Sequence, residues 1–237
     1  LVHRRVRFSN GVVGVIGSEE DEFNKKPDIR RLYIDIGADT RDEASKSVSI
    51  GDTAVFCGET VVSGNRIISK ALDNRAGCYI LISAMKKIKR NKNDLYFVFT
   101  TQEEVGLRGA KAAAYSVDPD YAIAIDVTDT GDTPECNVMD VKLGRGAAIK
   151  VMDSSIICDV DVRTVLIETA KKNKIPYQIE IMSDGGTDAG AVHLTRAGIK
   201  TGGISLPTRY IHSPSEMADI KDLEACCELL IKSVDAF

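Results

Sequence analysis

The sequence contains no apolar run near the roughly 18 residues that a membrane-spanning helix needs, and it contains no block of basic residues. We therefore expect neither a membrane nor a nucleic acid as a partner, and the formal net charge of −4 fits that expectation. CxxC spacing is also absent among the six cysteines, so neither a zinc clip nor a disulfide framework is indicated. We expect reduced thiols in the core of a cytoplasmic protein.

The chain has 237 residues, enough for one large domain or two modest ones, and its apolar content is that of an ordinary globular protein. The pattern changes near residue 65. Residues 1–65 are rich in β-branched residues, glycines and turn signals, whereas residues 66–237 alternate between strand-like and helix-like segments. We expect a small β-rich domain followed by a larger α/β domain in which helices sandwich a mixed sheet.

The β-rich region has one strong local signal. Asn10 and Gly11 lie between residues 6–8, where apolar and charged residues alternate, and the apolar run 12–16, which is typical of a β-hairpin. Thr40 is placed to cap a short helix over residues 43–47, and the charged residues 18–28 predict a loop. Further strands are expected at residues 32–36, 53–56 and 60–62.

In the second region, apolar spacing predicts helices over residues 74–89, 160–173 and 188–196, a helix from Gly106 and a last helix from near Asp219. Between them, β-branched apolar runs predict strands at residues 95–100, 121–125, 147–151, 177–181 and 200–205. In open α/β sheets, functional sites form at the carboxyl ends of the strands, so the residues that follow these strands are the candidates for chemistry.

Glu103 and Glu104 follow the strand predicted at 95–100. Neighbouring residues on extended chain point to opposite sides, so the two carboxylates are suited to different tasks. A Glu-Glu pair alone is more often a solvated acidic turn. Asp73 alone is most simply a helix N-cap, and Asp126 alone a turn residue after the strand 122–125.

Considered together, Asp73, Glu104, Asp126 and His212 are oxygen and imidazole donors at four separate strand or loop ends. Such a set suits zinc, cobalt or manganese, and a carboxylate-rich site favours two metal ions about 3.5–4 Å apart. Glu103 is then free of the metal and is the candidate general base.

Five motifs carry a family resemblance: residues 70–75 (KALDNR), 101–106 (TQEEVG), 124–128 (AIDVT), 185–189 (GGTDA) and 208–214 (TRYIHSP). In order and spacing they resemble the M42 family of metallo-aminopeptidases, which includes the TET and glutamyl aminopeptidases. The resemblance implies a zinc-peptidase-like catalytic domain, here residues 66–237. It also implies that residues 1–65 are the later part of a β-rich dimerisation insert.

By this resemblance, Asp73 bridges two divalent metal ions, zinc or cobalt with manganese as an alternative. Glu104 and His212 complete one metal site, Asp126 serves the other, and Glu103 moves the protons. Gly186, Thr187 and Arg209 resemble lining of the substrate pocket. The resemblance further implies peptide substrates and a homo-oligomer, either a dimer or a dodecamer.

The sequence departs from the family pattern at one point. Family members take a further metal ligand from a His-x-Asp segment, but His3 is followed by Arg4 and Arg5 and does not match. Because the chain opens at Leu1, we expect it to be part of a longer enzyme that lacks its N-terminal segment here.

Three other functions stay open at this point. Paired carboxylates such as Glu103 and Asp126 would also suit a metal-independent, cellulase-like glycosidase. A non-catalytic assembly subunit with a degenerate site is a second alternative, and a related metallo-hydrolase acting on acyl groups or other amides is a third.

Overall fold

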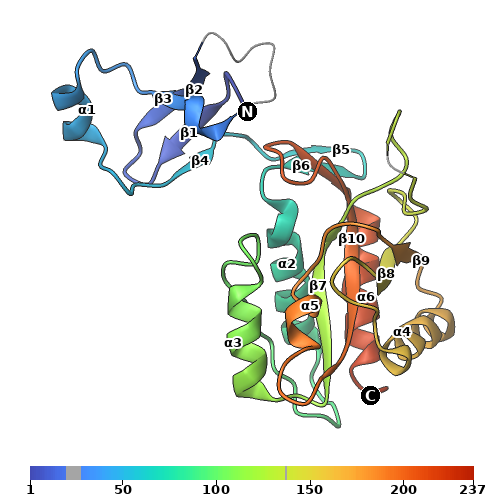
Figure 1. Ribbon diagram of the computed structural model, residues 1–237. Helices are drawn as coiled ribbons and strands as arrows, with labels where there is room; N and C mark the ends of the chain where they lie inside the picture. The colour runs from blue at the N-terminus through green and yellow to red at the C-terminus, as the bar shows by residue number, and fades with distance from the viewer. Residues whose placement is uncertain (20–27, 137) are drawn as a thin grey trace. The chain divides into compact units, whose positions relative to one another are not determined.

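The structure, a computed structural model, describes residues 1–19, 28–136 and 138–237 (Figure 1). The chain divides into two compact units, Leu1–Glu59 and Thr60–Phe237. This division falls slightly before the predicted boundary at residue 65, because β5 (Val61–Ser63) pairs with β6 (Arg66–Ser69) of the second unit. The assignment of the first unit as a dimerisation insert stays a prediction.

The first unit is an antiparallel sheet of four strands in the order β3-β2-β1-β4. The hairpin predicted at Asn10 and Gly11 is confirmed, and Thr40 caps α1 by accepting a hydrogen bond from the Glu43 N–H at 3.2 Å. Residues 20–27 of the predicted loop lie outside the described residues. The elements are β1 (Arg5–Phe8), β2 (Val13–Ser18), the 3-10 helix η2 (Ile29–Arg31), β3 (Leu32–Asp35), α1 (Arg41–Ser47) and β4 (Ala54–Phe56).

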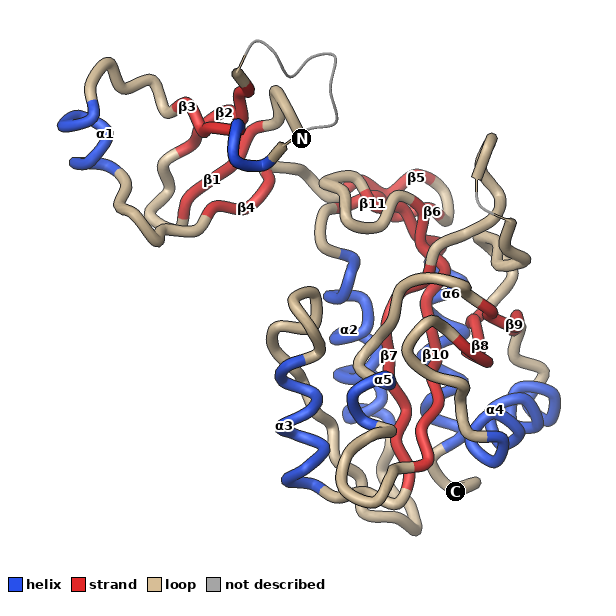
Figure 2. Tube along the Cα trace, in the orientation of Figure 1, coloured by secondary structure: helices blue, strands red, loops and turns tan. Residues whose placement is uncertain are grey.

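The second unit is built on a mixed seven-stranded sheet, drawn in red in Figure 2. Its path runs β5-β6-β11-β10-β8-β9, and β7 pairs with β10 in parallel, whereas β8 and β11 pair with β10 antiparallel. β10 is therefore the central strand. The remaining strands are β7 (Tyr121–Thr128), β8 (Ala147–Met152), β9 (Tyr177–Ile181), β10 (Lys200–Arg209) and β11 (Glu216–Asp219).

Helices cover both faces of this sheet. On one face α6 (Ile220–Ser233) contacts α2 (Leu72–Lys87) and α4 (Val160–Asn173) as well as β10, and Figure 1 shows α6 behind that strand. On the other face α5 (Ala189–Val192) contacts β7 and β10, and α3 (Arg108–Val117) packs against α5. The predicted fold class, a mixed sheet sandwiched by helices, is confirmed.

The core of this unit lies between β10 and the layer of α2, α4 and α6. Ile204 of β10 and Leu166 of α4 are fully buried there. Gly202 of β10 permits the close approach of α4, because a Cβ at that position would lie 2.5 Å from a Val162 methyl carbon. All six cysteines are free, but the exposed Cys78 is not the core thiol that we expected.

The prediction of a buried strand at residues 95–100 is wrong. The segment pairs with no strand among the described residues, and three of its large apolar side chains are exposed: Tyr96 to 67%, Val98 to 39% and Phe99 to 47%. An apolar run favours extended backbone, but a strand also needs a hydrogen-bonding neighbour. The helix predicted at 188–196 shortens to α5, and β10 continues past residue 205 to Arg209. Within the described ranges, no helix combines the length and apolarity needed to cross a bilayer.

The packing of α4 predicts that two leucines contribute very differently to the free energy of unfolding. Leu166 is 0% exposed, so Leu166→Ala should lower the free energy of unfolding by about 2–5 kcal/mol through lost burial and a cavity. Leu194 is 73% exposed, so the matched Leu194→Ala should change it by less than about 0.5 kcal/mol. Urea unfolding of both variants measures this, and equal midpoints would contradict the assigned core.

Candidate metal centre

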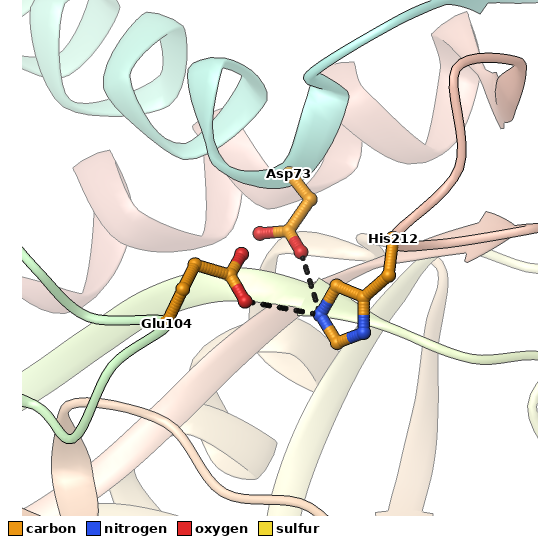
Figure 3. Close-up of side chains that lie close together, drawn as sticks. All are labelled: Asp73, Glu104 and His212. Atoms are coloured by element: carbon orange, nitrogen blue, oxygen red, sulfur yellow. Dashed lines mark ion pairs between the residues drawn. The ribbon is translucent and has the colours of Figure 1, made fainter. Parts of the chain in front are cut away.

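Three side chains far apart in the sequence meet at one point (Figure 3). Nε2 of His212 lies 3.2 Å from Oδ2 of Asp73 and 3.3 Å from Oε2 of Glu104. One donor atom from each residue lies within 4.8 Å of the others. Asp73 comes from the start of α2, Glu104 from the turn before α3, and His212 from the connection between β10 and β11.

The start of α2 is shaped around Asp73. The helix begins after Ala71, which has left-handed backbone and no capping side chain, and Asp73 itself has non-helical dihedral angles. Asn74 ties this turn to β7, because its Nδ2 donates to the Ile125 carbonyl at 2.8 Å while its Oδ1 accepts from the Gly77 N–H at 2.9 Å. A Cβ on Gly77 would lie 2.2 Å from that Oδ1, so a glycine is needed there. Asp73 is therefore not the N-cap of α2. It is a candidate metal ligand that the turn holds in place.

A buried carboxylate that the sequence analysis missed joins two of the three donor segments. Oε2 of Glu216, on β11, accepts a hydrogen bond from the Asp73 N–H at 3.0 Å, and the backbone of His212 also donates to this carboxylate. Burial raises the pKa of Glu216, and these backbone donors oppose the rise. No motif marked Glu216, because a single acid after a loop has no periodic signature.

The two neighbouring glutamates have different surroundings. Glu104 belongs to the three-residue group, whereas Glu103 does not. The Glu103 carbonyl accepts from the N–H groups of Gly106 and Leu107 at 3.0 and 2.9 Å, which forms the turn before α3. Burial, followed by repulsion from the carboxylates of Glu104 and Asp188, raises the pKa of Glu103 to about 7.

Asp126 lies within β7 and not at the end of a strand, because β7 continues to Thr128. It is buried, and its Oδ1 accepts from the Val127 N–H at 2.9 Å. Burial raises its pKa well above the usual value, and the charges of Asp73 and Glu103 raise it further. The hydrogen bond from Asn74 to the Ile125 carbonyl brings the neighbouring Asp126 close to the turn that carries Asp73, although Asp126 is not one of the three.

The donor set fits a divalent metal ion. Two ligand atoms about 2.0–2.2 Å from one tetrahedral zinc ion lie about 3.3–3.6 Å apart, and the two His212 atom pairs lie 3.2 and 3.3 Å apart. Burial and then repulsion by Glu104 raise the pKa of Asp73 to about 6. A cation at this point would relieve that repulsion, since a positive charge favours the carboxylate forms.

Comparison with known proteins decides the family. Residues 2–229 match the family model of the M42 glutamyl aminopeptidases. The chain belongs to this family. A relative from Acetivibrio thermocellus, named provisionally as an aminopeptidase, is 54% identical over 98% of this chain and 71% of its own length. The lysyl aminopeptidase of Pyrococcus furiosus is 34% identical over 97% of this chain and 69% of its own length.

The solved structures agree with this M42 membership. An aminopeptidase from the archaeon Desulfurococcus kamchatkensis matches with a TM-score of 0.94 and 40% identity, over 100% of this chain and 69% of that one. The likeness covers both units of the present chain. The M42 resemblance inferred from the five motifs is therefore confirmed.

The predicted substrate residues of this M42 chain lie in two places. Arg209, the last residue of β10, lines a pocket of about 400 Å³ together with Asp129, Asp184 and Tyr210. The Thr187 side chain is buried, and Gly186 packs against Ser155, where a Cβ would lie 3.0 Å from the hydroxyl oxygen. Neither of these two is among the described lining residues of the pocket. Another hollow of about 480 Å³, over α4 and the end of α6, contains none of the predicted site residues.

Asp188, beside Thr187, is a second acid that the sequence analysis did not single out. Its Oδ2 accepts from the Thr100 hydroxyl at 2.6 Å, and its buried Oδ1 has no hydrogen-bond partner among the described residues. Burial raises its pKa, and its charge acts in turn on Glu103 and Asp126. Asp188 thus adds negative charge to the centre from the α5 side of the sheet.

Arg209 is held by a second carboxylate, Asp132. Arg209 Nε donates to Oδ1 of Asp132 at 2.9 Å, and its second guanidinium nitrogen lies 2.8 Å from Oδ2. Burial alone would raise the pKa of Asp132, but hydrogen bonds from Arg209, Thr130 and the Leu143 N–H outweigh it and lower the pKa to about 2.

This pairing predicts a pH-dependent stability difference. Because the folded pKa of Asp132 lies below the unfolded value, its contribution is complete above about pH 4 and is lost as the pH falls towards 2. Asp132→Asn should therefore cost about 2 kcal/mol of unfolding free energy at neutral pH, with a difference from the parent that shrinks in acid. Urea unfolding between neutral and acidic pH measures it. A pH-independent difference, or the same loss in the exposed control Asp140→Asn, would contradict the assignment.

Proposed function

We propose that this chain carries the catalytic centre of a metal-dependent aminopeptidase that removes the N-terminal residue from peptides. The observation that carries the proposal is the meeting of Asp73, Glu104 and His212, with Glu103 beside them but outside the group. Membership of the M42 family supports the same reaction class. Assembly into a homo-oligomer stays a prediction from the family resemblance.

Asp73, Glu104 and His212 would hold one divalent ion, and Asp126 would serve a second ion with Asp73 as the shared ligand. When bound, such ions polarise the scissile carbonyl and make water a stronger acid. Zinc, cobalt and manganese are the three candidate metals, because each of them accepts a mixed set of oxygen and imidazole ligands.

Glu103 is the proton carrier of the proposed mechanism. Its carboxylate accepts a proton from the attacking water, and the resulting acid delivers that proton to the amine nitrogen as the C–N bond breaks. The turn closed by Gly106 and Leu107 keeps this side chain beside the metal ligands without making it one of them. Its pKa of about 7 reflects burial and neighbouring carboxylates, and bound cations would lower that value.

Substitution of Glu103 separates proton transfer from metal binding. Glu103→Gln keeps the size of the side chain but removes the basic carboxylate, so kcat should fall by about 10²–10⁴-fold while the bound metal stays near the parent amount. Hydrolysis of aminoacyl p-nitroanilides and metal analysis of the purified variant measure the two quantities.

Two matched variants control this test. Glu104→Gln should lose metal as well as activity, because Glu104 belongs to the donor group. Glu228→Gln, on the exposed face of α6, should behave as the parent. Near-normal turnover in Glu103→Gln would remove Glu103 from the role of base.

Metal removal distinguishes this function from the metal-independent glycosidase. Dialysis against EDTA should abolish peptide hydrolysis, and zinc, cobalt or manganese should restore it, because the bound ions would polarise the scissile carbonyl and make water a stronger acid. A glycosidase working through Glu103 and Asp126 would instead cleave carboxymethylcellulose in the presence of EDTA. Failure to cleave any p-nitroanilide with metal present would favour the assembly subunit.

A further inference from the structure

The pocket beside the metal centre offers more negative than positive charge. Three carboxylates line it, from Asp129, Glu135 and Asp184, whereas Arg209 is the single basic residue among its described lining. Arg209 is already paired through two nitrogens with Asp132. Its charge is therefore compensated within the protein and is not available to an acidic ligand.

Asp129 is a lining carboxylate on which the charge of a proposed metal ligand, His212, acts. It follows Asp126 by three residues at the exit of β7. Burial raises the pKa of Asp129, yet the structure gives it no hydrogen bond or ion pair to another described residue. The Asp129 oxygens are not among the buried atoms that lack a partner, so this carboxylate is open to the pocket and can pair with a ligand there.

The rest of the pocket suits a long side chain that ends in a cation. Its volume of about 400 Å³ is within the usual range for ligand sites, about 300–1,000 Å³. Ile181, Met182 and Met139 give it an apolar wall for methylene groups, and Tyr210 adds an aromatic ring, a favourable neighbour for a cation. Tyr210 precedes His212 by two residues, so the pocket and the metal donors share one loop.

We propose that this pocket receives the side chain of the N-terminal residue and selects lysine or arginine, with Asp129 as the principal counter-charge and Asp184 as a second one. The inference rests on the proposed aminopeptidase function. It assigns a basic substrate class to a chain whose family model carries the name of the glutamyl enzymes.

The test compares the metal-loaded protein on lysyl, norleucyl and glutamyl p-nitroanilides. Norleucine has the four side-chain carbons of lysine without the ammonium group, so the ratio of the two kcat/KM values isolates the charge. We expect lysyl to exceed norleucyl by about 10-fold to 100-fold, as for a hydrogen bond between charged groups. Glutamyl should be the poorest substrate, and added salt should reduce the lysyl preference.

Two kinds of variant assign the preference to the pocket. Asp129→Asn should bring the lysyl-to-norleucyl ratio close to one, and Asp129→Lys should make glutamyl the better substrate. Asp120→Asn, an exposed acid at the other end of β7, is the matched control and should keep the parent ratio. Calorimetric titration of lysinamide and norleucinamide into metal-loaded Glu103→Gln, in which hydrolysis is suppressed, gives the same comparison as a difference in binding.

The outcomes separate the two proposals. Good hydrolysis with a norleucyl or glutamyl preference, or a lysyl preference that survives Asp129→Asn, overturns the specificity and leaves the aminopeptidase function standing. No hydrolysis of any of the three substrates in the metal-loaded protein overturns the function, and the specificity with it.

Discussion

The burial of acidic groups close to one another is the constraint on which the second unit depends. Asp73, Glu103, Asp126 and Asp188 each have a raised pKa, and in each case burial is the largest cause. Repulsion from neighbouring carboxylates adds to it for the first three. A fold that gathers such groups loses free energy unless cations or protons compensate them. The arrangement therefore makes physical sense as a cation-binding centre and little sense as a purely structural one.

The backbone is organised to bear this cost. β10 pairs in parallel with β7 and antiparallel with β11, so the exit of β7 and the connection after β10 lie at the same end of the sheet. Asn74 ties the start of α2 to the Ile125 carbonyl on β7, and Glu216 ties the same turn to the His212 segment. Hydrogen bonds thus hold together the start of α2, β7 and the His212 segment. None of these bonds uses a side-chain atom that is proposed to bind metal. Ligand positions held in this way need little rearrangement when a cation binds.

The site combines two different uses of negative charge. In the candidate metal centre, Asp73 and Glu104 lie close to His212 at a spacing that fits a divalent cation. In the pocket that Asp129 and Asp184 line, both carboxylates share the lining with apolar side chains, and the partner that we propose is a monovalent organic cation. Arg209 illustrates why residue type alone is a poor guide to specificity: its guanidinium is engaged by Asp132, so its presence does not make the pocket basic.

Local sequence pattern determined several secondary-structure elements and three residues of the candidate metal centre. The amphipathic helix expected at 160–173 has those bounds as α4, the Asn10-Gly11 hairpin forms, and the motifs identify three donors that meet in space. These features depend on side-chain periodicity, turn chemistry or a short motif, and each of these can be recognised in one sequence alone. Three features were decided by tertiary structure alone. Residues 95–100 pair with no described strand, Glu216 links the Asp73 turn to the His212 segment, and Asp132 forms an ion pair with Arg209. Each of these depends on which distant group lies within hydrogen-bonding reach, and no local pattern carries that information.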